Sequence, residues 1–228
     1  MAADRNDERR RADRVGTRSW CATSSTSSVE WIPTPDLAHG AEHTLREFDG
    51  VWIAPGSPYE SMQGALAAIC VARTTALPLI GTCGGFQHVV IEYARNVLGV
   101  SDAEHAEYDP TASQLFITAL ECSLAGMTMS VRLRSGTLAA TAYRADETTE
   151  SYYCSFGLNA DYLGALETGG LSVSGVDQDG EVRVIELPTH PFFIATLFVP
   201  QMASTEQSPH PLVSAFVAAC ANATIARP

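Results

Sequence analysis

The strongest structural signal in this chain is the run Leu77-Pro78-Leu79-Ile80-Gly81-Thr82-Cys83-Gly84-Gly85-Phe86. Its first half, Leu77 to Gly81, predicts a buried strand, and the apolar stripe that follows predicts a helix from about Phe86 to Leu98. The same order precedes it, with a buried strand over Phe48 to Pro55 and a helix over Glu60 to Thr75. Strand, helix, strand and helix with brief connections predict a right-handed βαβ unit in a parallel sheet.

The second half of the chain changes to short strands separated by glycine-containing turns. Strands are expected over Leu115 to Leu120, Met129 to Leu133, Thr137 to Tyr143, Leu171 to Asp177 and Glu181 to Leu187. A strand over Phe192 to Phe198 and a helix over about Pro211 to Ala223 return to the core pattern. The predicted class is therefore α/β, with a mostly parallel central sheet and an antiparallel excursion in the second half.

Residues 1–28 differ in composition from the rest of the chain, because they are polar, rich in arginine and then in serine and threonine. They carry no apolar period, so we expect a disordered leader, followed by one domain over residues 29–228.

The overall composition excludes several function classes. The chain has 228 residues, a net charge of −12 and no lysine, so it has neither a Schiff-base lysine nor a P-loop. A body this acidic disfavours nucleic-acid binding, and the sequence has no uninterrupted membrane span and no secretory signal. Its six cysteines form no CxxC pair, so we expect no metal and no cofactor. These observations predict a cytoplasmic protein.

Cys83 lies where a strand turns sharply into a helix, which is the arrangement of a nucleophile elbow. The neighbouring glycines permit the cramped backbone, and the helix N-terminus lowers the pKa of a thiol. The loop that contains Ser57 should lie beside the elbow, so that its N–H and that of Gly84 would form an oxyanion pocket. The alternatives are a tight turn with a buried thiol and a simple strand-ending turn.

Further residues make the chain recognisable. The run Gly81-Thr82-Cys83-Gly84-Gly85-Phe86-Gln87-His88, with Ala106-Glu107-Tyr108-Asp109-Pro110 and His210-Pro211-Leu212, resembles the glutaminase domain of CTP synthase, a class I glutamine amidotransferase. With Pro55-Gly56-Ser57-Pro58-Tyr59, it is similar to the branch described as CTP synthase C-terminal-region-related proteins. The resemblance implies a three-layer, flavodoxin-like fold over roughly Val29 to Cys220. The synthetase half is absent from this sequence, so the chain cannot make CTP by itself.

The resemblance also implies roles for individual residues. Cys83 matches the nucleophile that attacks the amide of glutamine, Gly84 supplies an oxyanion amide, and Gln87 and Glu107 match residues that hold this small-molecule substrate. The family's Phe-His-Pro-Glu sequence, however, reads Phe198-Val199-Pro200-Gln201 here, so that Val199 replaces the base and Gln201 its glutamate partner. Loss of such a base can cost on the order of 10⁶ in turnover.

A second departure concerns the anchor for the substrate carboxylate, since the family's Arg-Tyr pair reads Ser155-Phe156 here. We therefore expect a cysteine-dependent amidotransferase-like domain that is not an efficient glutaminase and acts on another substrate. His88 is a candidate replacement base, although its position on the elbow helix points partly away from the sulfur. The alternatives are a non-catalytic binding or regulatory module, and a redox protein that pairs Cys83 with Cys154, although Cys122 and Cys154 are otherwise expected as buried thiols on strands.

The start of the domain also differs from the family, which opens with a strand and a long helix before Val29. Either the first βα unit is missing, or residues 15–28 fill it poorly. This predicts an exposed parallel strand edge, which would favour a homo-oligomer.

Overall fold

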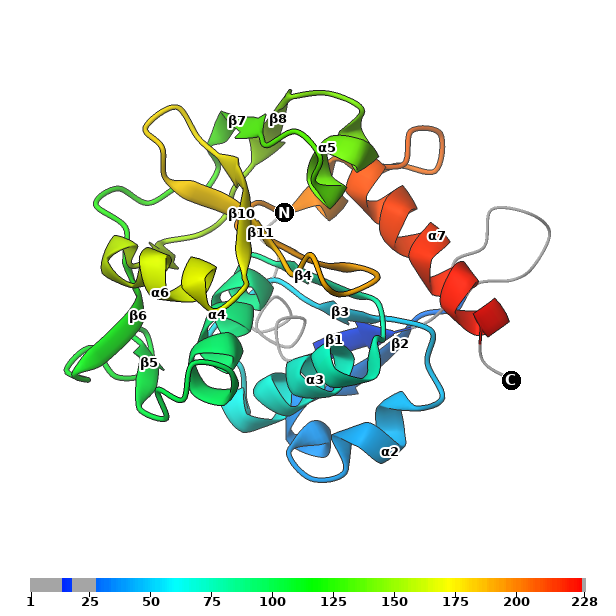
Figure 1. The fold of residues 1–228 in the computed structure, drawn as a ribbon, viewed down its shortest axis with the longest axis horizontal. Coiled ribbons are helices and arrows are strands. Elements are labelled where there is room, and N and C mark those ends of the chain that lie inside the picture. The colour runs from blue at the N-terminus through cyan, green and yellow to red at the C-terminus, as the bar shows by residue number, and fades with distance from the viewer. Residues whose placement is uncertain (1–13, 18–27, 227–228) are drawn as a thin grey trace, which may run out of the picture.

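The computed structural model describes residues 14–17 and 28–226, which form three layers around a nine-stranded sheet (Figure 1). In spatial order the strands of this sheet are β2 (Glu30–Pro33), β1 (Arg14–Thr17), β3 (Val51–Ile53), β4 (Leu79–Thr82), β12 (Phe193–Thr196), β11 (Val182–Glu186), β10 (Ser172–Val176), β7 (Thr128–Leu133) and β8 (Glu147–Ser151). The centre is parallel: β4 pairs with β3 on one side and with β12 on the other. The remaining pairs are antiparallel, so the predicted α/β fold is confirmed, with a mixed sheet.

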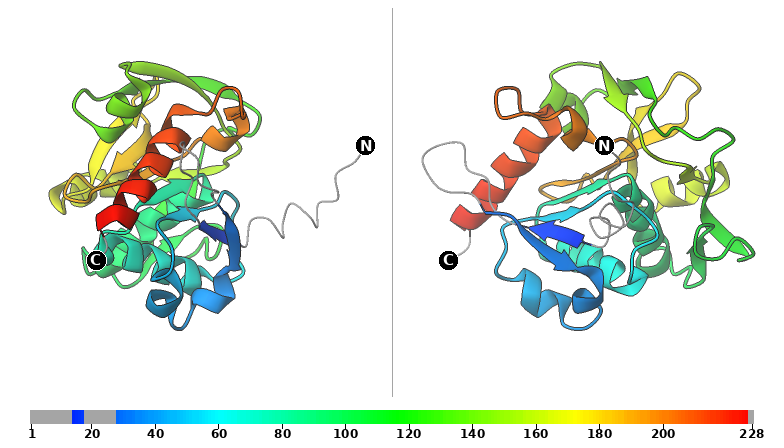
Figure 2. Two further views of the ribbon diagram at one scale, coloured as in Figure 1. Left: turned by 90° about the vertical axis from the view of Figure 1, so that its right-hand side faces the viewer. Right: turned by 180° about the vertical axis from the view of Figure 1, so that it is seen from behind.

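Helices cover both faces of the parallel centre (Figures 1 and 2). On one face lie α3 (Met62–Thr75) and α4 (Gly84–Asn96), with the short helix α2 (Ala41–Leu45) packed against α3. On the other lies α7 (Pro211–Ala226), where the ring of Phe216 meets Trp52 of β3 edge to face at 6.1 Å. Strand residues therefore alternate between the two helical layers, as a buried parallel sheet requires.

A smaller sheet covers the outer side of α4. The loop between its strands β5 (Ala103–His105) and β6 (Gln114–Ala119), which contains Glu107, lies near the N-terminus of α4. This sheet also contains β9 (Phe156–Leu158). Next to it lie the 3-10 turn η2 (Ala160–Tyr162) and the helix α6 (Leu163–Thr168). The ring of Tyr162 stacks on Phe116 of β6 with centroids 3.9 Å apart, which holds η2 against this small sheet. Two more 3-10 turns are η1 (Thr34–Leu37) and η3 (Pro200–Ala203).

One predicted strand is wrong, because the segment Thr137 to Tyr143 forms the helix α5 (Leu138–Tyr143). Thr137 caps this helix: its Oγ1 accepts a hydrogen bond from the backbone N–H of Ala140 at 3.2 Å. Buried Glu186 accepts two further N–H groups of the first turn, those of Leu138 and Ala139. A side-chain cap and alanine-rich sequence thus favoured a helix over the apparent strand pattern.

The structure also changes the expectation for the start of the domain. Strand β1 lies within the segment predicted to be a disordered leader, and it pairs antiparallel with both β3 and β2. The predicted exposed parallel edge is therefore wrong, because β1 covers β3 and leaves the antiparallel strand β2 outermost. The antiparallel direction of β1 also means that it forms no parallel βα unit with β3. The rest of the expected leader, residues 1–13 and 18–27, lies outside the described residues.

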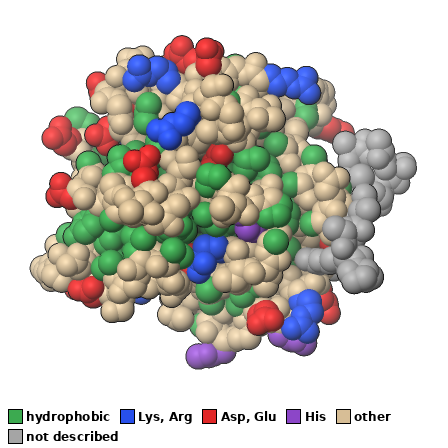
Figure 3. Space-filling model, in the orientation of Figure 1, with side chains coloured by type: hydrophobic (Ala, Val, Ile, Leu, Met, Phe, Trp, Pro, Cys, Tyr) green, Lys and Arg blue, Asp and Glu red, His purple; other side chains and the backbone are tan. Residues whose placement is uncertain are grey.

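The distribution of charged side chains on the surface agrees with the acidic composition of the chain. On the face drawn in Figure 3, arginine side chains lie singly, with acidic side chains spread among them. No described helix combines the length and the apolar character that crossing a bilayer demands.

Candidate functional site

Cys83 lies between β4 and α4, at the end of the strand pair β4 and β12. Its φ of 51° and ψ of −106° place a non-glycine residue in an unfavourable backbone region, which costs roughly 1–3 kcal/mol. Its N–H donates to the Thr196 carbonyl at 2.8 Å, which continues the hydrogen bonding of the sheet into the turn. A Cβ at position 84 would collide with the carbonyl oxygen of Gly56, so only glycine lets the two loops approach this closely. The predicted elbow is thus present.

The Cys83 sulfur accepts hydrogen bonds from three directions although the residue is only 6% exposed. Cys154 Sγ lies 2.7 Å from Cys83 Sγ and donates to it, while the backbone amides of Gly56 and Gly84 also point to this sulfur. These contacts, with that of Cys154 the largest, lower the pKa of Cys83 against the opposing effects of burial and the Glu107 charge. The same contact, together with burial, raises the pKa of Cys154. Of the two thiols, Cys83 is therefore the one whose ionisation is favoured, and Cys154 is the one that holds its proton.

Cys154 comes from the segment between β8 and β9, not from a strand as the sequence suggested. Its thiol has one proton, and its sulfur also lies 2.9 Å from the carbonyl oxygen of Leu197. The expectation of a buried thiol is confirmed for this residue, whereas Cys122 is exposed. Sequence reasoning raised the Cys83–Cys154 pair only as an alternative, yet the structure brings the two sulfurs into direct contact.

Gln87 lies one turn into α4, and its side chain is used within the protein. Its Nε2 donates to the carbonyl oxygen of Phe156 at 2.9 Å, and its Oε1 lies 3.2 Å from Ser57 Oγ and 3.1 Å from His105 Nε2. His105 Nδ1 accepts the backbone N–H of Glu107, so the ring donates through Nε2. Gln87 thereby ties together the loops that surround the elbow. His105 was missed from the sequence, where only its position two residues before Glu107 pointed to the site.

Ser57 contributes through its hydroxyl, and the amide that reaches the sulfur is that of Gly56. The oxyanion role of the Ser57 N–H stays a prediction. Gly56 was not singled out from the sequence, although the turn after a neighbouring parallel strand was the correct place to look.

His88 contacts the backbone of the elbow through the first turn of α4. Its Nδ1 donates to the Gly84 carbonyl at 2.7 Å, and its Nε2 accepts from the Tyr108 hydroxyl at 3.0 Å, while the Tyr59 ring packs on it with centroids 4.3 Å apart. Burial lowers the pKa of His88 to about 4, so the ring is neutral near pH 7. Because both nitrogens are engaged in these contacts, the geometry makes His88 a positioning residue and gives no support to its role as the base.

Two acceptor atoms near the elbow lack any hydrogen-bond partner among the described residues: Oε2 of Glu107 and Oε1 of Gln201. Both atoms are buried. Glu107 forms no ion pair between described residues, yet its charge acts on the Cys83 sulfur, which places the carboxylate near it. Gln201 makes only a long contact, 3.5 Å, from its Nε2 to Thr82 Oγ1.

The positions that differ from the family pattern carry no basic group. Val199 is a buried hydrocarbon whose N–H donates to the Ser151 carbonyl at 3.0 Å. Ser155 Oγ lies 3.0 Å from Ser123 Oγ, and the Phe156 ring lies 5.2 Å from the His105 ring. Among the described residues, no three histidine, cysteine, aspartate or glutamate side chains are grouped to hold a metal ion.

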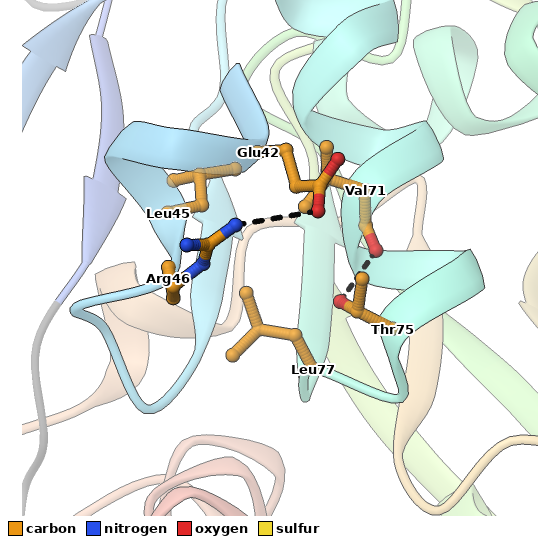
Figure 4. A pocket seen from close by; sticks show the side chains of 6 residues that line it. All are labelled: Glu42, Leu45, Arg46, Val71, Thr75 and Leu77. Atoms are coloured by element: carbon orange, nitrogen blue, oxygen red, sulfur yellow. Dashed lines mark hydrogen bonds and ion pairs between the residues drawn. The ribbon is translucent and has the colours of Figure 1, made fainter. Parts of the chain in front are cut away.

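A separate hollow of about 220 Å³ lies at the other end of β4, between α2 and α3 (Figure 4). It is lined by Glu42, Leu45, Arg46, Val71, Thr75 and Leu77. Its polar groups are engaged with one another or with backbone: Arg46 lies 3.6 Å from Glu42, and Thr75 Oγ1 donates to the Val71 carbonyl. Leu77 precedes β4 and Cys83 follows it, so this hollow is not part of the elbow site.

Comparisons with known proteins agree with this arrangement. A family model described as glutamine amidotransferase class-I matches residues 17–219. CTP synthase from Nostoc punctiforme is 37% identical over 202 residues, and that from Bifidobacterium longum is 34% identical over 218 residues. These matches cover 84% and 88% of this chain but only 37% and 39% of the relatives, so the chain spans well under half of their length.

Among solved structures, the glutaminase domain of Trypanosoma brucei CTPS with bound acivicin has a TM-score of 0.80 and 27% identity. That match covers 85% of this chain and 80% of the solved one. A Thermoplasma acidophilum protein described as part of a GMP synthase, at 15% identity and a TM-score of 0.56, shares the fold alone. The chain therefore belongs to the class I glutamine amidotransferase family and is related to the glutaminase domain of CTP synthase.

Proposed function

We propose that this domain uses Cys83 for acyl transfer from an amide other than free glutamine. The observation that carries the proposal is the contact between the sulfurs of Cys83 and Cys154, 2.7 Å apart, at the N-terminus of α4. A thiol donor together with two backbone amides stabilises the thiolate directly. Nucleophilic attack then needs no imidazole to remove a proton.

The first chemical step follows from this environment. The Cys83 thiolate attacks the acyl carbon, a C–S bond forms, and the C–N bond breaks as the amine leaves with a proton from solvent. The amides of Gly56 and Gly84 point to the position of the sulfur, so they are the nearest donors for the oxyanion that develops beside it. Water or another nucleophile then releases the acyl group from Cys83.

The surroundings also favour a class of substrate. Glu107 presents a buried carboxylate oxygen without a partner, which suits an ammonium group on the substrate. Ser155 and Phe156 offer no cation for a carboxylate. An amide that bears an amino group and lacks the α-carboxylate of glutamine therefore fits better than glutamine itself.

The test compares two kinds of alkylating reagent on the reduced full chain. A diazoketone analogue of glutamine is expected to label Cys83 slowly, whereas the generic reagent iodoacetamide labels it readily, with mass spectrometry locating both adducts. Glutamine should release ammonia only at the rate of a Cys83→Ser variant, while amino-bearing amides without the carboxylate should release it faster than that variant. Rapid diazoketone labelling with measurable glutamine hydrolysis would disprove the changed substrate.

The second candidate function is a non-catalytic binding or regulatory module. The exposure of Cys83, only 6%, favours it because a bulky substrate must displace neighbouring groups to reach the sulfur. The rate of iodoacetamide labelling against pH separates the two. A midpoint below that of an ordinary thiol, moved upward by Cys154→Ala, which removes the donor, supports the enzyme, whereas an ordinary midpoint in both proteins supports the module.

A further inference from the structure

We propose that Cys83 and Cys154 form a reversible redox pair that reduces small hydroperoxides and becomes an intramolecular disulfide. This activity uses the same sulfur as the acyl transfer but does not depend on it. The pair consists of a thiolate in contact with a second thiol, which is the arrangement in which an oxidised cysteine can be resolved.

The two sulfur atoms need to move little to form a disulfide bond. The two sulfurs lie 2.7 Å apart, and a disulfide is about 2.05 Å long, so they have to approach by about 0.7 Å. Cys83 is held by Thr196 on the sheet, whereas Cys154 lies on an irregular segment whose backbone carbonyl accepts the N–H of Leu124. Both backbones are thus hydrogen-bonded to neighbouring segments, so the approach falls to small movements of the two side chains.

The reaction balances in two steps. The Cys83 thiolate attacks the outer oxygen of the hydroperoxide, the O–O bond breaks, and the leaving alkoxide or hydroxide takes a proton from solvent. Cys83 is now a sulfenic acid. The Cys154 sulfur then attacks the sulfenic sulfur, its proton and the hydroxyl leave as water, and a disulfide forms. A dithiol reductant returns two electrons and two protons and is itself oxidised to a disulfide.

Burial of the cysteines limits the size of the oxidant that can reach Cys83, and it also affects which cysteine reacts. Cys83 is 6% exposed and Cys154 is 2% exposed, so a small molecule such as hydrogen peroxide reaches the sulfur more easily than a bulky peroxide. Burial raises the pKa of Cys70, and it raises the pKa of Cys220 to about 12, so these two thiols stay protonated and react slowly. At Cys83, by contrast, burial is opposed by three hydrogen-bond donors to the sulfur, the thiol of Cys154 and the amides of Gly56 and Gly84.

The experiment treats the reduced full chain with one equivalent of hydrogen peroxide and maps its peptides without reduction. We expect loss of two of the six thiols and a linked peptide pair containing Cys83 and Cys154, both restored by dithiothreitol. Cys83→Ser should slow the peroxide-dependent loss of thiols roughly tenfold or more. In Cys154→Ser, oxidation should stop at a sulfenic acid on Cys83 that dimedone labels, while the exposed Cys122→Ser serves as the matched control and behaves as the unchanged protein.

The proposal is overturned if the map of the unchanged protein contains no Cys83–Cys154 linkage, or if Cys83 goes on to a sulfinic acid or links to another cysteine. This map decides the matter even if a variant fails to fold. The acyl-transfer test is run on reduced protein, so the failure of one proposal is visible separately from the failure of the other.

Discussion

The two sides of the Cys83 site have diverged to different degrees. The nucleophile side, which consists of the loop at Gly56, the elbow and the start of α4, keeps the features that the family chemistry needs. The partner side consists of the segments 151–156 and 197–201. It presents Val199 and Gln201 at the positions that the sequence resemblance matches to an imidazole and a carboxylate, and it adds the Cys154 thiol. Both sides meet at the same sulfur. The site can therefore hold a charged nucleophile without the group that usually creates it.

The replacement changes what the partner side can do. An imidazole gains and loses a proton near neutral pH and can pass it to a leaving group. In the reduced protein the Cys154 thiol, whose pKa is raised by its contact with Cys83 and by burial, keeps its proton and donates to the Cys83 sulfur. The nucleophile is thus stabilised at rest but is not assisted during turnover. This difference favours slow acyl chemistry and, because the partner is itself a thiol, oxidation chemistry.

The largest expected effect is the loss of folding stability at low pH that His88, on the nucleophile side, causes. His88 has an ordinary pKa of 6.5 when unfolded and of about 4 in the fold, a difference worth about 3 kcal/mol. Below pH 6.5 the unfolded chain binds a proton that the folded chain does not. The stability that His88 contributes is therefore complete above pH 6.5 and is lost as the pH falls to 4.

Urea unfolding at pH 6.5 and at pH 4 measures this loss, and His88→Gln should reduce the difference between the two free energies of unfolding. His105, whose pKa burial lowers to about 3, adds to the acid sensitivity of both proteins. Exposed His43→Gln is the matched control and should keep the full difference. If His88→Gln keeps it as well, the ring is not buried in its neutral form.

Gly84→Ala breaks the contact that joins the two loops of the nucleophile side. The added methyl group would meet the Gly56 carbonyl, so the backbone must shift, at a cost of about 1–3 kcal/mol. The Gly56 amide then moves away from the sulfur and Cys83 alkylation slows. The control is Gly164→Ala in α6, where a methyl group meets nothing within 4 Å and helix propensity predicts a gain of about 0.5–1 kcal/mol. Equal outcomes for the two variants would contradict the close approach.

Val199→His combined with Gln201→Glu restores the family residues on the partner side. Placing the larger, polar imidazole in the space packed for Val199, which is 3% exposed, should destabilise the fold by about 1–3 kcal/mol in urea unfolding. Ammonia release from glutamine should stay at background, because Ser155 and Phe156 still provide no carboxylate anchor. A base contributes roughly 10²–10⁴ in rate, so a rise of that size would show that the missing base alone limits the domain. Val199→Leu is the control for packing.

The sequence predicted the nucleophile side because its signals are local. Glycines flank Cys83 within a few residues, and the carboxyl ends of neighbouring parallel strands must share one crevice, which brought the Gly56 loop to the elbow. The contact with Cys154 is different, since 71 residues separate the two sulfurs. The path of the segment between β8 and β9 depends on antiparallel pairings that no local pattern specifies. Chemistry therefore suggested the pair, but only the tertiary structure brought it together.

Two fold errors have the same origin in distant contacts. The α5 segment alternates like a strand, and buried Glu186, far along the chain, accepts the N–H groups of its first turn. Strand β1 reads as polar leader, and its pairing with β3 comes from the backbone of a sheet edge that is otherwise unpaired. In both places a partner remote in sequence decided the local structure.

The smallest expected effect concerns the Ser57 hydroxyl. Its removal shows whether this group only stabilises the nucleophile side or also changes the reactivity of Cys83. Ser57→Ala removes the hydroxyl that lies 3.2 Å from Gln87 Oε1, which keeps its hydrogen bond from His105. Losing one half-buried hydrogen bond should cost about 0.5–1 kcal/mol in urea unfolding. The control, exposed Ser113→Ala, should stay within about 0.5 kcal/mol of the unchanged protein. Since Ser57 Oγ contacts Gln87 and not the sulfur, iodoacetamide labelling of Cys83 should keep its pH midpoint, and a shifted midpoint would assign the hydroxyl to the reactive centre itself.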